Sequence, residues 1–549
     1  MALQNSRLPG TDTAQPQAWE AQHAQICRRA AAEGMVLLEN NGILPLHAGD
    51  RLALYGSGAR YTVKGGTGSG SVNNRYAVSV DQGLRDAGIV ITTDAWLDDY
   101  DLRRKKARED WMAEIYAHSA PGDFDSFYRA HATRPLRAPA GMEVSGGDCE
   151  SALYVISRIS GEGADRTLSK GDYFLSEIEE AELQAVCRAY RNVIVVLNVG
   201  GVMDLSFMDA YPISALVLMS QAGQEGGHAL ADVLTGAVPF SGHLTDSWPV
   251  HYEDIHDSAH FSHNDGNIIR EYYTEDIYVG YRFYDTFSVK PRYAFGYGLT
   301  YTSFARSVPE TLLFGAQARA SLTVTNTVRC EGRDMVQFYA ACPWGLRRKE
   351  AKRLVAFAKT PLLRPGESCS LSVSIPLRAL ASFHTGRAAW FLDAGDYVLL
   401  SGSDAAHVTP FARLQLRKTA FLHETGNILP LQDALKTLNP ERQQAIPGAD
   451  ACPAFDLTPC LDAISCQFLP EAPCETDRPY REEAERILRT LNATQKAALC
   501  AGRLSSGKAE FIGNAAAQVP GAAGETASVL LASHGLRGAV MAEIGRAHV

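Results

Sequence analysis

A glutamate between two glycines is the first feature of this sequence that could do chemistry. The segment ISRISGEGADR places Glu162 in a short loop directly after an apolar run. The flanking glycines remove side-chain bulk and permit unusual backbone angles, so another molecule can approach the carboxylate. Arg158, Asp165 and Arg166 are near enough along the chain to orient this carboxylate or shift its acidity. The residues alone support an acid/base hypothesis for Glu162, and a solvated loop glutamate is the alternative.

A glycine-rich segment, KGGTGSGS at 64–71, is the second feature that suggests a ligand. It lacks the G-K-[ST] ending of a phosphate-binding P-loop and the G-x-G-x-x-G spacing of a dinucleotide fold. A flexible loop that lets the backbone approach a ligand is the favoured interpretation. Serine hydrolase chemistry is not supported, because the glycines around Ser57, Ser69 and Ser71 fall at the wrong offsets for a nucleophile elbow.

The histidines and cysteines do not have the spacing of a metal site. Four cysteines, Cys452, Cys460, Cys466 and Cys474, are separated by eight, six and eight positions, unlike the short pairs of a zinc site. The four histidines within 251–263 lie in an Asp- and Ser-rich context that favours a surface loop. We therefore expect no metal and no cofactor.

Composition limits the classes of partner. The chain has 549 residues, enough for three or four domains, and a net charge of -10, which argues against nucleic-acid binding. No apolar stretch approaches the ~20 residues of a membrane helix, and the N-terminus lacks a signal-peptide core. Eleven scattered cysteines fit reduced thiols. These observations predict a cytoplasmic protein without a membrane partner, and homo-oligomerisation stays open.

The elements that position Glu162 follow an α/β pattern up to about residue 298. Short apolar runs such as 51–58, 89–93 and 152–158 alternate with amphipathic stretches, including a helix with Ser176 as its N-cap. This pattern predicts a mostly parallel sheet covered on both faces. Ligands collect at the carboxyl ends of the strands in such sheets, and Glu162 lies just beyond one of them.

The pattern changes near residue 300. Segments with period-two alternation and intervening turns, up to about 420, predict an antiparallel β-sandwich of the fibronectin or immunoglobulin type. From 420 to 480 the chain is irregular, and helical signals return before a final helix, turn and strand. Because one strand of a βα architecture cannot bury itself, this end is expected to be truncated.

Several long motifs, in order, resemble glycoside hydrolase family 3, the β-glucosidase group. The entry into its α/β sandwich domain and two of its loops near the active site are recognisable, as are a signature at 221–249 and the passage into a fibronectin type III-like domain. These segments read AAAEGMVLLENNGILPL, YTVKGGTGSGSVN, ISRISGEGADR, QAGQEGGHALADVLTGAVPFSGHLTDSWP, DIYVGYRFYDT, YAFGYGLTYTSF and LVAFAKTPLLRPGES.

The resemblance implies a domain plan. It gives an α/β sandwich domain over 1–298 and a fibronectin type III-like domain over 299–420. A linker and the incomplete beginning of a (β/α)8 barrel would occupy 421–549, the inverted order of a subgroup. Glu543 stands where relatives have an Asp that contacts the sugar, and the closing IGRAHV does not match. IGRAHV is also what one frame of a common sequencing adapter encodes, so we expect an artefactual end.

The resemblance also implies roles. The S-G-E-G loop assigns general acid/base to Glu162, while the nucleophile Asp belongs to the barrel and is absent from this chain. Substrate contacts are expected from the two loops, namely Arg158, Lys64, Gly65, Gly66 and Thr67. The implied activity is retaining hydrolysis of terminal β-D-glucosyl residues in β-glucosides or short β-linked oligosaccharides, with this chain an inactive fragment.

Two alternatives stay open. One is a non-catalytic carbohydrate-binding or scaffold protein. The other is a different glycosidase specificity, such as that of a β-xylosidase, or of an N-acetylglucosaminidase, which the S-G-E-G loop argues against. The insert at about 98–150 could carry contacts to the leaving group.

Overall fold

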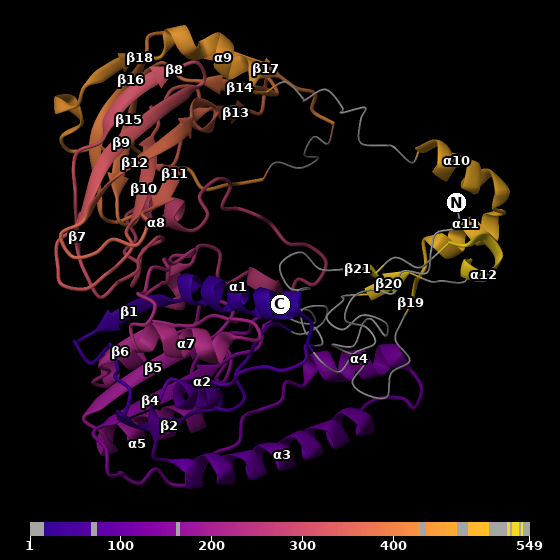
Figure 1. Cartoon of the computed structure of the whole chain (residues 1–549). Coiled ribbons are helices and arrows are strands. Elements are labelled where there is room, and N and C mark those ends of the chain that lie inside the picture. Colours follow the sequence, from indigo (N-terminus) through magenta and orange to yellow (C-terminus); the bar gives the residue numbers. More distant parts are fainter. Residues whose placement is uncertain are drawn as a thin grey trace.

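The computed structural model describes residues 16–66, 74–160, 165–428, 435–468, 481–503, 524–526, 530–536 and 540–541. Two large bodies are visible in Figure 1, an α/β body built from the first part of the chain and a β-sandwich built from the part after about residue 300. This is the predicted order of an α/β domain followed by a fibronectin type III-like sandwich.

A six-stranded sheet forms the centre of the α/β body. Its order is β1-β6-β5-β4-β2-β3, and every neighbouring pair is parallel except β1 with β6. The central strands are apolar and buried on both faces, as covered parallel sheets require. In sheet order the strands are β1 Val36–Asn40, β6 Ala215–Leu218, β5 Asn192–Asn198, β4 Ser151–Ser157, β2 Arg51–Tyr55 and β3 Val90–Ile91.

Helices cover this sheet. They are α1 Ala18–Gly34, α2 Val80–Asp86, α5 Glu177–Ala189, α6 Phe207–Ala210 and α7 Gly226–Leu234. Helix α8 (Tyr281–Phe287) instead packs against the β-sandwich, where Tyr281 contacts the cluster around Tyr339. Helix α5 begins as predicted at Ser176, whose hydroxyl accepts from the Glu179 amide in a capping box. Helices α2 and α7 pack so closely that a Cβ on Gly227 would lie 2.0 Å from the carbonyl oxygen of Ser79. Only glycine therefore fits there.

A helical insert separates β3 from β4. It consists of α3 Asp94–Ala117 and α4 Phe124–Thr133, which pack against each other. Helix α3 is the long helix along the lower edge of Figure 1, and it extends well past the sheet. Trp96, Leu97 and Tyr100 bury its first turns in the core of the α/β body, and Ile115 is buried near its other end.

The β-sandwich has the alternating pattern that the sequence predicts. Along β9, every second side chain is buried and the others face solvent. Its sheets have the orders β11-β10-β15-β16-β18, β12-β9-β7 with β8 beside β9, and β13-β14-β17. The strands are β7 Phe304–Arg306, β8 Glu310–Phe314, β9 Gln317–Asn326, β10 Met335–Ala341, β11 Arg353–Lys359, β12 Ser368–Pro376, β13 Ser382–His384, β14 Ala389–Leu392, β15 Gly395–Gly402, β16 Val408–Leu416, β17 Ala420–Glu424 and β18 Ala454–Asp456.

The sandwich extends past the expected boundary at 420. Strand β18 pairs in parallel with β16, and Leu422, Leu457 and Ile464 lie in the core of the sandwich. Helix α9 (Leu461–Cys466) packs against β17. The described residues 454–466, expected to be part of a linker, therefore belong to the sandwich, because Leu457 and Ile464 are buried in its core.

The described residues beyond 480 form small elements. Helices α10 Arg481–Thr490, α11 Ala493–Leu499 and α12 Leu531–His534 accompany the strands β19 Gly502–Arg503, β20 Gly524–Thr526 and β21 Val540–Met541. These three strands pair antiparallel, whereas neighbouring barrel strands are parallel. The beginning of a barrel is not confirmed and stays a prediction. Among the described helices, none combines the length and apolar character needed to span a bilayer.

Candidate active site

Asn198 joins three loops at the carboxyl edge of the sheet. It is the last residue of β5 and fully buried. Its side-chain oxygen accepts from the Val63 amide at 2.6 Å and from the Ser157 hydroxyl at 2.9 Å. Its side-chain nitrogen donates to the carbonyls of Val63 at 2.9 Å and Ser220 at 2.7 Å. One amide thus fixes the loops that follow β2, β4 and β6.

The glycine loop leaves this edge beside Asn198. The Lys64 carbonyl accepts from the Gly223 amide at 2.9 Å, and the Lys64 ammonium donates to the side chain of Asn74. Burial lowers the pKa of Lys64. Gly65 is half-buried and Gly66 is buried, while Thr67 lies outside the described residues. The expected contacts of Lys64, Gly65, Gly66 and Thr67 with a substrate stay predictions.

Residues that follow the glycine loop are bound by side chains of the segment 221–249. The Tyr76 hydroxyl donates to the buried carboxylate of Glu225 at 2.5 Å. The His228 ring bridges Glu225 and Asp86, at 2.7 Å and 2.9 Å. Burial opposes a charge on His228, but its hydrogen bonds to these two carboxylates raise its pKa. The signature therefore anchors the residues that follow the glycine loop to α7.

Glu162 lies outside the described residues, but both sides of its loop are described. On the near side, the Arg158 amide donates to the Asn198 carbonyl at 3.1 Å. A Cβ on Gly200 would lie 2.0 Å from the Ser160 hydroxyl, so the turn after β5 also packs against the start of this loop. The loop therefore leaves the sheet at the same edge as the glycine loop.

The Arg158 guanidinium is fully engaged within the protein. It is buried and forms a bidentate pair with Glu179 at 2.5 Å and 2.7 Å. Its remaining donors reach the carbonyls of Ser157 at 2.9 Å, Asp172 at 3.0 Å and Phe174 at 3.3 Å. An arginine has five N–H donors, and all five are used here. Arg158 thus fixes the base of the loop. It has no N–H group left to donate in the substrate contact expected from the sequence.

Arg166 fixes the other side of the loop. Its guanidinium donates to the side chain of Asp172 and, at 3.0 Å, to the Asp172 carbonyl. The same carboxylate accepts from the Thr167 amide at 2.5 Å and the Thr167 hydroxyl at 2.9 Å. The residues on either side of 161–164 are therefore joined through Asp172.

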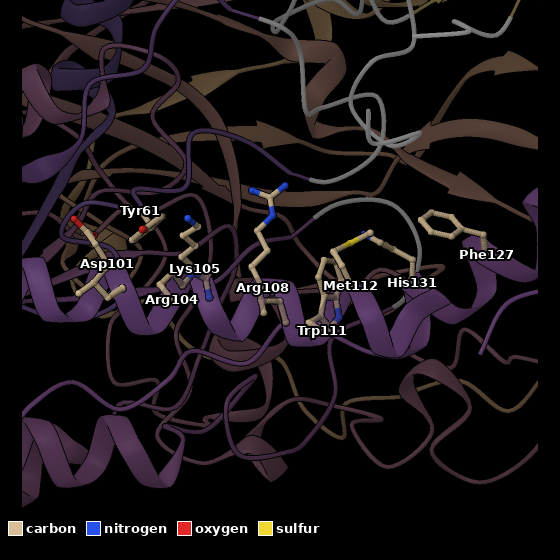
Figure 2. A pocket seen from close by; sticks show the side chains of 11 residues that line it. Tyr61, Asp101, Arg104, Lys105, Arg108, Trp111, Met112, Phe127 and His131 are labelled. Atoms are coloured by element: carbon tan, nitrogen blue, oxygen red, sulfur yellow. The ribbon is translucent and has the colours of Figure 1, made fainter. Parts of the chain in front are cut away.

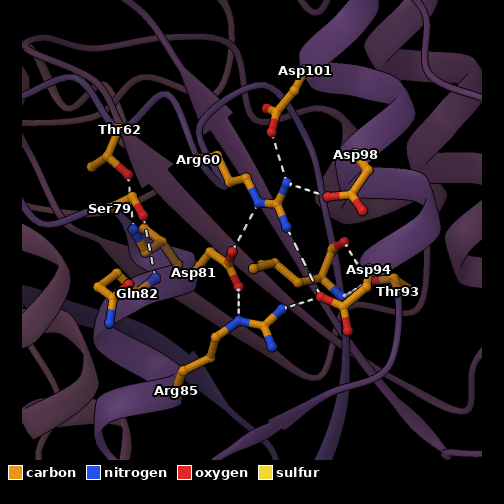
Figure 3. Close-up of polar contacts among 12 residues, drawn as sticks. Arg60, Thr62, Ser79, Asp81, Gln82, Arg85, Thr93, Asp94, Asp98 and Asp101 are labelled. Carbon is orange, nitrogen blue, oxygen red and sulfur yellow. Dashed lines mark hydrogen bonds and ion pairs between the residues drawn. The ribbon is translucent and has the colours of Figure 1, made fainter.

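A charge network ties the loop after β2 to the helical insert (Figure 3). Arg60 donates to Asp81 at 2.9 Å, Asp98 at 2.8 Å and Asp101 at 2.7 Å. Arg85 donates to Asp81 at 2.7 Å and supports the same cluster. Since Asp98 and Asp101 belong to α3, the position of this helix is coupled to the loop that leads to Lys64.

Sequence reasoning missed Asn198, Glu179 and Asp172. A polar residue ending the apolar run VIVVLN was a usable signal for Asn198, because carboxyl ends of parallel strands meet at one edge. Glu179 stands three residues after its N-cap and carries the capping-box pattern, but its pairing with Arg158 has no signal in the sequence. Asp172 has no distinguishing pattern either.

The described residues contain no group of three or more His, Cys, Asp or Glu side chains placed to hold a metal. The histidines between 251 and 260 lie in a loop with the 3-10 helix η2 (Tyr252–Asp254). The ten cysteines whose positions the structure gives are free thiols.

Comparison with known proteins places this arrangement in a family. Residues 35–301 match the glycosyl hydrolase family 3 C-terminal domain, and residues 334–405 match the fibronectin type III-like domain. Beta-glucosidase A of Butyrivibrio fibrisolvens is 34% identical over 432 residues, covering 69% of this chain and 49% of that protein. A beta-glucosidase of Ruminococcus albus is 31% identical, covering 74% of this chain and 42% of that protein. The chain thus spans about half the length of these relatives.

Solved structures agree. Beta-glucosidase 3B from Thermotoga neapolitana, in complex with glucose, is similar with a TM-score of 0.61 at 36% identity, covering 74% of this chain and 54% of that one. A beta-glucosidase from Paenibacillus barengoltzii has a TM-score of 0.69 at 29% identity, covering 97% of this chain and 58% of that one. With its α/β domain, its fibronectin type III-like sandwich and its two anchored loops at one sheet edge, the chain belongs to glycoside hydrolase family 3.

Proposed function

We propose that this chain is the acid/base half of a retaining β-glucosidase, in which Glu162 protonates the leaving oxygen. The relatives and solved structures named above are β-glucosidases. One observation carries the assignment to this site: Asn198 joins the base of the Glu162 loop to the base of the glycine loop through Ser157 and Val63. Both loops therefore start at the same edge of the sheet, which supports the proposal that one ligand contacts both.

The anchoring suits a proton donor. A general acid acts only if its carboxyl group is held within hydrogen-bond reach of the leaving oxygen. Arg158 and Arg166 fix the residues on either side of the loop, while the glycines beside Glu162 leave room for a sugar. Retaining hydrolysis needs a second carboxylate about 5–5.5 Å away as the nucleophile. We propose that this Asp belongs to the part of the relatives that the chain does not match.

Because the proposal places the acid/base in this chain and the nucleophile outside it, purified residues 1–549 should not hydrolyse aryl β-glucosides. The measurement is release of 4-nitrophenol from 4-nitrophenyl β-D-glucoside, with a β-glucosidase as positive control. Turnover that disappears in Glu162→Gln would show that the chain holds both carboxylates and would refute this placement of the nucleophile.

The role of Glu162 is tested in a version of the enzyme that includes a barrel domain. Glu162→Gln should lower hydrolysis of an alkyl β-glucoside by about 10²–10⁴-fold, because the leaving alkoxide then lacks a proton donor. Hydrolysis of 2,4-dinitrophenyl β-glucoside should fall far less at the glycosylation step, since that leaving group needs no proton. The exposed Glu177, changed to Gln, is the matched control. Equal losses with both substrates would contradict an acid role.

A further inference from the structure

A groove lies along α3, outside the residues discussed so far as a catalytic site. It has a volume of about 560 Å³ and runs between α3, α4 and the loop after β2 (Figure 2). A volume of this size is typical of small-molecule sites. Its lining combines apolar side chains with basic ones. These include Tyr61, Leu102, Arg104, Lys105, Trp111 and Phe127.

Aromatic rings form the walls of the groove. The indole of Trp111 is held in place because its N–H donates to the Arg134 carbonyl at 2.5 Å. The His131 ring meets Trp111 edge-on at 5.0 Å between ring centroids. At the other end, the Arg104 guanidinium lies over the Tyr61 ring at 5.4 Å. Fixed rings of this kind suit a planar aromatic ligand, which gains stacking contacts beyond simple burial.

The charge of the lining favours an anion. Arg104, Lys105 and Arg108 follow one another along α3, and Asp101 supplies the single carboxylate among the described side chains of the lining. Asp101 has a cationic partner in Arg60 at 2.7 Å, which it shares with Asp81 and Asp98. The lining itself keeps more cationic than anionic side chains. This local excess of positive charge is opposite to the net charge of -10 of the chain. A carboxylate on the ligand would therefore be complementary.

One end of the groove is lined by Tyr61, which stands three residues before Lys64 in the chain. Tyr61 lies between Arg60, which is tied to α3, and Lys64, which lies in the glycine loop. Tyr61 and Asp101 stand at one end of the groove and Phe127 at the other (Figure 2). A substrate whose sugar lies beside the glycine loop could place its leaving group along α3.

We propose that this groove binds the leaving group of the substrate, and that this leaving group carries an aromatic ring and a carboxylate. The assignment deepens the proposed function and rests on it. It makes the α3–α4 insert the part of the chain that selects among β-glucosides. Arg104 and Lys105 attract the carboxylate, and Trp111 and Tyr61 contact the ring.

Binding is measured on residues 1–549 by saturation-transfer NMR titration, which requires no hydrolysis. The probes are 4-hydroxycinnamate and its neutral counterpart, 4-hydroxycinnamyl alcohol. The acid should bind about tenfold more tightly, and Arg104→Met and Lys105→Met should each weaken the acid about three- to fivefold while leaving the alcohol unchanged, as expected for exposed charge pairs. Trp111→Leu should weaken both probes. Lys106→Met is the control, because Lys106 pairs with Asp110 on the same helix and does not line the groove.

Three results would overturn the proposal: no saturation transfer at millimolar probe, equal affinity for acid and alcohol, or equal effects of Arg104→Met and Lys106→Met. Circular dichroism melts show whether each variant is folded, and Lys105→Met, at an exposed position, keeps the charge test valid if Trp111→Leu unfolds. Loss of the acid/base role of Glu162 would leave these affinities unchanged. Failure of this proposal can therefore be told apart from failure of the proposed function.

Discussion

Arg158 and Arg166 donate to the same carbonyl oxygen, that of Asp172, each at 3.0 Å. They stand on opposite sides of the segment 161–164 that contains Glu162. Two side chains converging on one acceptor fix the distance between the two sides of the loop. The placement of an acid/base carboxylate thus depends on residues that do not react.

Arg158→Met should destabilise the protein by about 3–5 kcal/mol, because it leaves the buried Glu179 carboxylate without its partner. The measurement is the free energy of unfolding in urea. The double variant Arg158→Met, Glu179→Met should lose less than the single one, since no buried charge remains unpaired. Lys170→Met, which removes an exposed pair with Glu177, is the control and should change little. A single variant as stable as this control would disprove the buried pair.

Asn198→Ala should destabilise the carboxyl edge of the sheet by about 2–4 kcal/mol, since several buried polar groups lose their partner. Hydrogen exchange should become faster at the Val63 amide, which donates to Asn198, and should stay unchanged in the sandwich strands. Asn192→Ala, at the opposite end of the same strand, breaks one bond to Ser151 at 3.3 Å and serves as the matched control. Equal exchange in the two variants would show that Asn198 does not join the loops.

His228 should make stability depend on pH. Burial opposes its charge, but Glu225 and Asp86 outweigh this and raise its pKa above the ordinary 6.5. A raised pKa in the folded state means that the stabilisation is fully present below about pH 6.5 and is lost as the pH rises through the folded pKa. Wild type should therefore exceed His228→Gln in melting temperature more at about pH 6 than at about pH 8.5. The exposed His118, changed to Gln, gives the baseline.

A constant difference in melting temperature between wild type and His228→Gln across this range would contradict the bridge. In a Glu225→Gln background, the difference in melting temperature between the protein with His228 and the His228→Gln variant should be smaller at every pH. One of the two carboxylates that favour the charged ring is then gone.

Arg60→Met should destabilise the protein by about 1–2 kcal/mol, because Asp98 and Asp101 then lose their ion pair with Arg60 while Arg85 reaches only Asp81 and Asp94. Thermal melts at low and high salt measure this, and added salt should reduce the loss by screening the repulsion. Arg103→Met on the same helix removes one exposed pair with Asp99 and should cost less than about 0.5 kcal/mol. If the two variants lose equal stability, the network does not hold α3 to the loop.

The sequence by itself determined the order of the two architectures and the edge of the sheet at which β4 ends and the segment 158–160 begins. Apolar runs such as VIVVLN and the period-two alternation of 317–326 depend on local burial, which is written into consecutive residues. The capping box at Ser176 is equally local. The resemblance to family 3 follows from motifs of this continuous kind.

Only the tertiary structure decided which polar side chains act together. Arg158 looked like a substrate contact, yet Glu179, on a helix 21 positions later, engages it. The tertiary structure also decided the place of β18, which pairs with β16 about forty residues earlier in the chain. These pairings depend on which surfaces meet when the chain folds. The sequence around a charged residue contains no local pattern that identifies its partner.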